Sequence, residues 1–164
     1  MGAAGTSGAP APRRAPKPPG AAAPPVLLDT NALLLPFREG FPLERELARV
    51  APGRAVRVPD SARIELERLV ARGVPGSPAA LAWALRCGRI AAPGRGDRAV
   101  EAAARRLGAW VVTADRALAR RLRARGLTVL RPSGHGRLRL EPGTTAAGAP
   151  ARANPPGTRT VGNR

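Results

Sequence analysis

Several residue types on which common catalytic sites depend are nearly missing from this 164-residue sequence. It has one lysine (Lys17), one histidine (His135), one cysteine (Cys87) and no tyrosine. A single cysteine cannot form an internal disulfide, so a reducing, cytoplasmic location is expected. One histidine and one cysteine cannot supply the ligands of a zinc site built from these residues.

The scarcity of lysine also excludes two classes of protein that place an aspartate after their first strand. Haloacid-dehalogenase phosphatases and response-regulator receivers both need a lysine near that aspartate. The Gly-Lys-Ser/Thr of a phosphate-binding P-loop is absent, as is the Gly-x-Gly-x-x-Gly of a dinucleotide-binding fold. No apolar run approaches the roughly 20 residues of a membrane-spanning helix, so no membrane association is expected.

Acidic residues are scarce and arginines are abundant. The chain has 28 Lys and Arg against 11 Asp and Glu, a formal net charge of +17. Part of this excess reflects a GC-rich codon bias, because all but one of the basic residues are arginines. Residues 26–141 alone carry about +11, so the charge does not depend on the ends of the chain. Such a balance favours a polyanionic partner, most simply RNA.

Both ends of the chain differ in composition from its centre. Residues 1–25 hold seven prolines and no acidic residue, and residues 142–164 are similarly rich in Pro, Gly, Thr and Ala. Such segments cannot bury enough apolar surface to offset their ordering entropy, so both are expected to be disordered. The remaining residues, 26–141, are enough for one domain with its own core.

Short apolar runs alternate with helical patterns along this domain. Strands are expected at 26–29, 55–59, 109–113 and 127–132, with an edge strand at 136–141. Helices are expected at 41–51, 60–73, 77–88, 96–108 and 115–126. This alternation indicates an α/β fold, with a central parallel sheet flanked by helices on both faces.

Helix signals within these segments give further expectations. Asp60 and Ser77 are expected to be N-caps of the helices that they open. The apolar side of the helix at 60–73 is expected to consist of Ile64, Leu66, Leu69 and Val70. Gly108 and Gly126 are expected to end the helices that precede them.

Three of the four aspartates fall where a parallel sheet places its ligands. Asp29 directly follows "VLL", Asp115 comes two residues after "VVT", and Asp97 opens a helix. Ligands of open parallel sheets bind beyond the carboxyl ends of the strands. Glu65, one turn into its helix, is a fourth candidate, with Glu67 as its rival.

Grouped carboxylates repel each other unless a cation joins them. Hard oxygen ligands select Mg²⁺ or Mn²⁺, which can promote cleavage of a phosphodiester. Each acid also has a structural interpretation. Asp97 and Asp115 would serve as helix caps, and Glu65 would pair with Arg68 or Arg72. Thr30 and Asn31 would form a turn.

The segments "VLLDTNALLLPF", "VPDSARIELERL" and "GDRAVEAAARRLGAWVVTADRALARRLRARGLTVL" together resemble the PIN-domain nucleases. More narrowly, they resemble small archaeal PIN proteins related to the PIN proteins of the eukaryotic small-subunit processome. The resemblance covers residues 26–141. It implies a PIN-like, Rossmann-like three-layer fold and a Mg²⁺- or Mn²⁺-dependent endoribonuclease, with a role in rRNA processing.

The family's catalytic and metal-binding acids fall on Asp29, Glu65, Asp97 and Asp115. The resemblance implies that Asn31 orients the first aspartate, with Thr113 as its counterpart in the last motif and Thr30 in support. Close relatives often carry two adjacent acids at the third motif, where this chain has Gly96 before its aspartate. That departure leaves open whether one metal ion or two would bind.

Two other functions remain open at this stage. One is a non-catalytic RNA-binding PIN module in ribosome assembly, and the other is the ribonuclease toxin of a toxin–antitoxin pair. In each case RNA is the partner, and the helix at 115–126 offers Arg116, Arg120 and Arg123 on one face for its phosphates. A homodimer through "LAWALRC" (81–87) is a further expectation.

Overall fold

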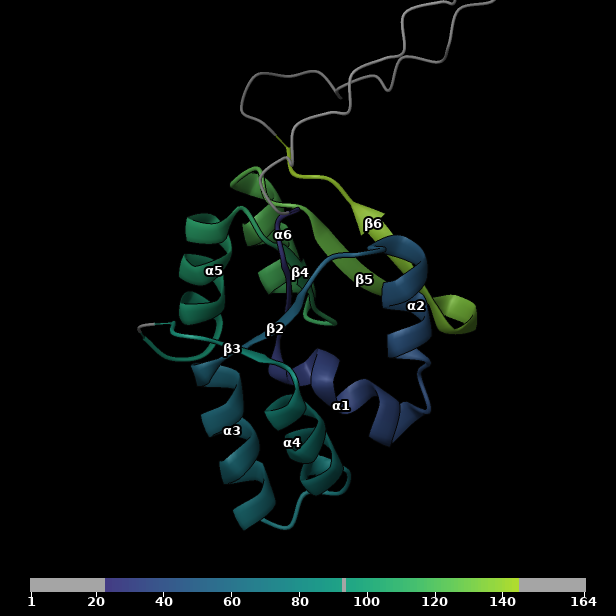
Figure 1. Ribbon diagram of the computed structural model, residues 1–164, viewed down its shortest axis with the longest axis vertical. Coiled ribbons are helices and arrows are strands. Elements are labelled where there is room, and N and C mark those ends of the chain that lie inside the picture. Colours follow the sequence, from purple (N-terminus) through teal and green to yellow (C-terminus); the bar gives the residue numbers. More distant parts are fainter. Residues whose placement is uncertain (1–22, 93, 145–164) are drawn as a thin grey trace, which may run out of the picture.

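A six-stranded sheet forms the centre of the protein. The computed structural model describes residues 23–92 and 94–144. The strands are β1 (Val26–Leu28), β2 (Val56–Pro59), β3 (Gly88–Ile90), β4 (Trp110–Val112), β5 (Val129–Ser133) and β6 (Arg137–Glu141). Their order is β3-β2-β1-β4-β5-β6 (Figure 1). The first five strands are parallel, and β6 is an antiparallel edge strand paired with β5.

Helices cover both faces of this sheet. They are α1 (Thr30–Glu39), α2 (Leu43–Val50), α3 (Asp60–Ala71), α4 (Ser77–Arg86), α5 (Gly96–Leu107) and α6 (Arg116–Ala124). The first four contribute to one apolar cluster, and α5 and α6 contribute to the other. The predicted three-layer α/β fold is therefore confirmed.

Successive side chains of a strand point to opposite faces of the sheet, so the central strands contribute to the core on both faces. In β1, Val26 and Leu28 pack with the α1–α4 layer, whereas Leu27 packs with α5 and α6. All three side chains are fully buried, as expected for a strand in a parallel sheet covered on both faces. Their uniform burial explains why this strand reads as an unbroken apolar run.

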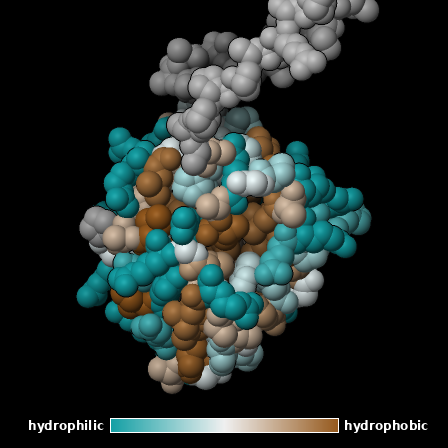
Figure 2. All heavy atoms as spheres, in the orientation of Figure 1, coloured by the Kyte–Doolittle hydropathy of each residue, from teal (hydrophilic) through white to brown (hydrophobic). Residues whose placement is uncertain are grey.

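The outer surface is mainly hydrophilic, with apolar residues showing in limited areas. On the face drawn in Figure 2, hydrophobic residues appear near the middle of the molecule and in a strip over α3 and α4, with hydrophilic residues around them. Four large apolar side chains of the described residues are exposed: Phe37, Ile64, Leu85 and Leu140. Two of them, Ile64 and Leu85, belong to α3 and α4.

The predicted tails, 1–25 and 142–164, lie almost wholly outside the described residues. The described parts of these segments contact the domain. The Pro25 carbonyl accepts a hydrogen bond from the Trp110 amide, and the Thr144 amide donates to the Arg123 carbonyl. Within the described part of the chain, no helix is long and apolar enough to span a membrane.

One α-helix and one strand were not predicted from the sequence. Helix α1 contains Pro36 and a run of buried residues, Ala32–Leu35, without helical periodicity. It forms because Asp29 caps its first turn and Gly40 ends it in the left-handed conformation, at a φ of 63°. Strand β3 was not predicted: its first residue, Gly88, was expected to end the helix at 77–88 and the other two were assigned to no element, but all three extend the sheet beside β2.

Three expectations about helix ends and faces are wrong. The Asp60 carboxylate does not cap α3, because it binds the Arg89 guanidinium at 2.5 and 3.1 Å. The Ser77 hydroxyl does not cap α4, since it donates to the Val74 carbonyl at 2.6 Å. Ile64 is 47% exposed, so it does not belong to the apolar side of α3. Of the four residues predicted for that side, only Leu66 is fully buried.

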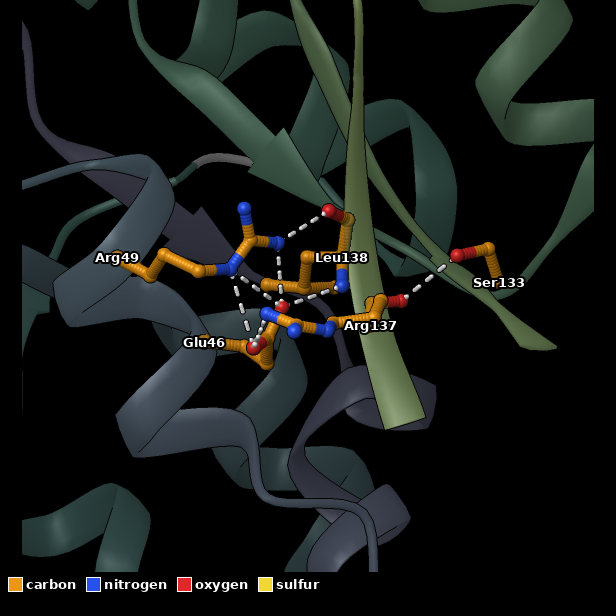
Figure 3. A network of polar contacts seen from close by, with 5 residues as sticks. All are labelled: Glu46, Arg49, Ser133, Arg137 and Leu138. Atoms are coloured by element: carbon orange, nitrogen blue, oxygen red, sulfur yellow. Dashed lines mark hydrogen bonds and ion pairs between the residues drawn. The ribbon is translucent and has the colours of Figure 1, made fainter. Parts of the chain in front are cut away.

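A buried carboxylate fastens the edge strand to α2 (Figure 3). Glu46 is 1% exposed and accepts hydrogen bonds from the Arg49 side chain and from the Leu138 amide, the latter at 2.8 Å. Arg49 in turn donates to the Leu138 carbonyl at 2.9 Å. The hydrogen bond from Arg49, followed by that from Leu138, lowers the pKa of Glu46 to about 2. The network therefore engages both the amide and the carbonyl of Leu138 on the edge strand β6.

Candidate active site

The turn between β1 and α1 buries a carboxylate at the centre of the sheet edge. Asp29 is only 5% exposed, and its Oδ1 accepts a hydrogen bond of 2.6 Å from the Ala32 amide. The Thr113 side chain, which follows β4, also hydrogen-bonds this carboxylate. The two strands are neighbours in the sheet, so their carboxyl ends bring these residues together.

Burial makes ionisation of Asp29 unfavourable. Desolvation raises its pKa from 3.8 to about 7, against the opposing hydrogen bonds from Thr113 and Ala32. The negative charges of Asp97 and Asp115 add to this rise in pKa. A carboxylate held in this state is stabilised by a cation, and strongly perturbed acids of this kind are typical of functional sites.

Three of the four predicted acids line one small pocket of about 60 Å³. Asp29 comes from the end of β1, Glu65 from α3 and Asp97 from the first turn of α5. The Thr30 hydroxyl donates to Glu65 Oε2 at 2.6 Å, so it fixes this side chain across 35 residues of sequence. We call this space, which Thr30, Asn31, Ser61, Ala62, Gly96 and Val100 also line, the acid pocket.

Asp115 lies nearby but does not line the acid pocket. It caps α6, one of the two interpretations predicted, and accepts hydrogen bonds from the amides of Ala117 and Leu118 at 2.6 and 3.0 Å. The Leu118 amide is the main cause of its lowered pKa. The Asp115 amide donates to Thr113 Oγ1 at 3.0 Å, which links Asp115 to the threonine that binds Asp29.

Asp97 is held by an arginine of the neighbouring helix. Its Oδ2 accepts a hydrogen bond of 2.8 Å from Arg121 of α6, and both side chains are about half exposed. Asp97 is not the N-cap of α5, which begins after Arg95. This ion pair is a contact that the sequence pattern does not indicate, because it depends on how α5 and α6 pack together.

The acid pocket suits a hard divalent cation in its chemistry. It gathers carboxylate oxygens around a buried acid whose pKa is raised. Ser61, which also lines the pocket and is 9% exposed, has a buried Oγ with no hydrogen-bond partner among the described residues. As the side chains lie, however, no group of three His, Cys, Asp or Glu among the described residues could hold a metal ion. Thr30 hydrogen-bonds one carboxylate oxygen of Glu65, and Arg121 hydrogen-bonds one carboxylate oxygen of Asp97.

The three predicted supporting residues, Thr30, Asn31 and Thr113, lie near the acids, but they do not all contact Asp29. Thr30 binds Glu65 and Thr113 binds Asp29. Asn31 lines the pocket and is exposed, and among the described residues its side chain makes no hydrogen bond to Asp29. Its orienting role stays a prediction.

The arginines predicted to hold RNA are not equivalent. Arg116 and Arg120 are exposed on α6 and have no ion pair within 23–92 and 94–144. Arg123 is tied to Glu141 at 3.3 Å and donates to the Pro142 carbonyl. The predicted face of three arginines is therefore partly used to fasten the end of β6.

Two features of the site were not found from the sequence. Ser61 has an unpartnered buried hydroxyl at the pocket, and no motif distinguishes it from an ordinary residue of the first helical turn. Gly96, which stands where close relatives often carry a second acid, has a φ of +54°. A residue with a side chain would be strained in this conformation, although a Cβ there would meet nothing within 4 Å. The backbone thus accounts for a glycine at this position.

Comparisons with known proteins identify the family and support the fold. Residues 26–134 match a family described as a PIN-like domain. One similar solved structure is titled "Structure of the PIN domain endonuclease Utp24". It has a TM-score of 0.61 and 23% identity, over 74% of this chain and 95% of that chain. No curated protein matches the sequence significantly. The resemblance to PIN-domain nucleases is confirmed, and the narrower likeness to archaeal proteins stays a prediction.

Proposed function

Since the chain belongs to the PIN-like domain family, we propose that it is a metal-dependent endoribonuclease, with the acid pocket as its active site. The observation that carries this proposal is the convergence of Asp29, Glu65 and Asp97 from three separate elements on one pocket, where the pKa of Asp29 is raised to about 7. A group of acids around one buried carboxylate, within a chain of charge +17, needs a functional reason.

The proposed cofactor is Mg²⁺ or Mn²⁺. Asp29 and Asp97 would hold it, with Glu65 and Asp115 as further oxygen donors. When bound, such an ion lowers the pKa of a bound water and stabilises negative charge on the phosphate. The chain's own residues prepare the site: Thr30 orients Glu65, and Thr113 holds Asp29 while it accepts a hydrogen bond from the Asp115 amide.

The proposed substrate is RNA, held mainly through its phosphates. The described domain carries few aromatic side chains, with two Trp and two Phe in the whole chain, so base stacking contributes little. Arginine binds phosphate in a bidentate manner and is the dominant basic residue here. A role in rRNA processing, which the resemblance to processome PIN proteins suggests, is part of the proposal. So is a cytoplasmic location, which the single cysteine suggests.

A second function is favoured by one observation. Because the carboxylates as they lie do not form a group that could hold a metal among the described residues, a non-catalytic RNA-binding module fits the same surface. The toxin of a toxin–antitoxin pair would share the active site, and a small antitoxin-like reading frame beside the gene would support it.

Cleavage assays separate these functions. The purified protein should cut structured RNA with Mn²⁺ or Mg²⁺, and EDTA should stop it. Asp29→Asn should abolish cutting, while Glu67→Gln, which changes an exposed acid of the same helix as Glu65, should not. If RNA binds but neither metal supports cleavage of any substrate, the binding module is the correct function.

A further inference from the structure

An open groove adjoins the acid pocket along α3. It has a volume of about 730 Å³ and lies between that helix and residues 94–96. Ser61, Glu65 and Gly96 line both the groove and the acid pocket, so the two spaces adjoin each other. We call this space the α3 groove. Its remaining lining includes Ile64, Arg68, Arg72 and Arg95.

Among the described residues, the arginine side chains of the α3 groove have no polar partner. Arg68, Arg72 and Arg95 make no side-chain hydrogen bond or ion pair with any residue in the described ranges. On α6 and just after it, by contrast, three arginines are engaged: Arg121 with Asp97, Arg123 with Glu141 and Arg125 with Glu101. Unpaired guanidinium groups around an open space are available to an anionic ligand.

The spacing along α3 places these groups in one row. Ser61, Glu65, Arg68 and Arg72 are separated by four, three and four residues, which puts them on the same side of a helix. At 1.5 Å per residue the row spans about 16 Å, room for more than one nucleotide. It begins at the acid pocket and leads away from it.

Two other side chains favour a nucleic-acid strand as the occupant. Ser61 Oγ is buried without a partner at the junction of groove and pocket, where it can donate to a phosphate oxygen. Ile64 is 47% exposed in the groove and offers an apolar surface to a base of any identity. A row of phosphate-binding groups beside an apolar contact suits sequence-independent binding of a single strand.

We propose that the α3 groove binds the backbone of single-stranded RNA on one side of the bond that is cut. This inference rests on the proposed function. The phosphate nearest the acid pocket meets Ser61, and the following phosphates meet Arg68 and Arg72, with Arg95 on the opposite wall. The groove, rather than the predicted arginine face of α6, is then the main track, because Arg68 and Arg72 line the space beside the acid pocket, whereas Arg116 and Arg120 are not among the described residues that line it.

The test is the salt dependence of binding of a fluorescent single-stranded RNA, measured by anisotropy in EDTA so that no cleavage occurs. Each phosphate of a single strand that is neutralised by a basic side chain contributes about 0.7 to the slope of log K against log salt. The double variant Arg68→Gln/Arg72→Gln, which leaves two phosphates without their guanidinium groups, should therefore lower the slope by about 1.4. If the two affinities converge at 1 M salt, binding at 0.15 M weakens roughly tenfold.

The matched control is Arg45→Gln/Arg139→Gln, which removes the same charge from α2 and β6, where neither residue has an ion pair in the described part of the chain. It should leave the slope within about 0.3 of the wild-type value. A second comparison, Arg116→Gln/Arg120→Gln, tests the rival track on α6. Circular dichroism checks that every variant is folded.

A fall in slope in the Arg68/Arg72 variant alone supports the proposal. An equal fall in the control, a fall confined to the Arg116/Arg120 variant, or no RNA binding by the wild type would overturn it. Because binding is measured without metal, the groove can pass this test even if no metal supports cleavage. The failure of the groove and the failure of the proposed nuclease are thus distinguishable.

Discussion

Replacing Asp29 by asparagine should stabilise the metal-free protein while abolishing its activity. The carboxylate is 5% exposed, and burial together with Asp97 and Asp115 raises its pKa from 3.8 to about 7. Asparagine keeps the shape of the side chain and is as good an N-cap as aspartate, so the hydrogen bond to the Ala32 amide can persist. The variant therefore removes the charge and leaves the turn into α1 intact.

The stability gained by Asp29→Asn should increase as the pH rises. A carboxyl group whose pKa is raised on folding binds more protons in the folded state, so its contribution to stability falls as the pH rises from about 3.8 to about 7. At 1.36 kcal/mol per pKa unit, the raised pKa of Asp29 costs about 4.3 kcal/mol at pH 8, where the folded protein must bury the ionised group, and about 1.7 kcal/mol at pH 5, where the folded protein keeps the group protonated. The stability gained by Asp29→Asn should thus be about 2.6 kcal/mol larger at pH 8 than at pH 5.

Urea denaturation in EDTA at pH 5 and pH 8 measures this difference, and the comparison with the wild type cancels the titration of all other groups. Cleavage of RNA by the variant, with Mn²⁺ or Mg²⁺, should be lost at both pH values. A gap between variant and wild type that is the same at the two pH values would mean that Asp29 titrates normally. A large loss of stability at pH 8 would mean that its charge is structural.

Three further predictions concern other parts of the molecule. Glu46 has a pKa lowered to about 2 from 4.5, so its stabilising contribution is present above about pH 4.5 and is lost as the pH falls toward 2. Glu46→Gln should be less stable than the wild type in urea at pH 7, and the gap should shrink at pH 3; a constant gap contradicts the assignment. Ser61→Ala removes an unpartnered buried hydroxyl, so the Tm should hold or rise while affinity for single-stranded RNA falls; unchanged affinity would leave Ser61 without a role in the groove. Leu85, 58% exposed on α4, carries the predicted dimer contact. Leu85→Glu should convert any dimer seen by size-exclusion chromatography to monomer, and a persisting dimer would place the interface elsewhere.

Local sequence determined the layout of the fold and the position of the acids. Apolar runs of three to five residues alternating with helical patterns can be buried only as a covered parallel sheet, so the strands other than β3 and five of the helices were predictable. Because parallel strands end at the same edge, the placement of Asp29 and Asp115 beyond β1 and β4 followed from their positions alone. The cap at Asp115 was predictable too, since it depends on amides two and three residues away.

Packing between distant elements decided the rest. Helix α1 could not be recognised, because all of Ala32–Leu35 are buried and no polar face marks the helical period. Whether Ile64 faces the core or the solvent depends on how α3 sits against the sheet and α5, which its own sequence does not specify. The raised pKa of Asp29, the ion pair of Asp97 with Arg121 and the engagement of Arg123 by Glu141 all join residues that are far apart in the chain. Desolvation and ion pairing depend on the surroundings in space, so only the tertiary structure determines which carboxylate is buried and which arginines are held in ion pairs.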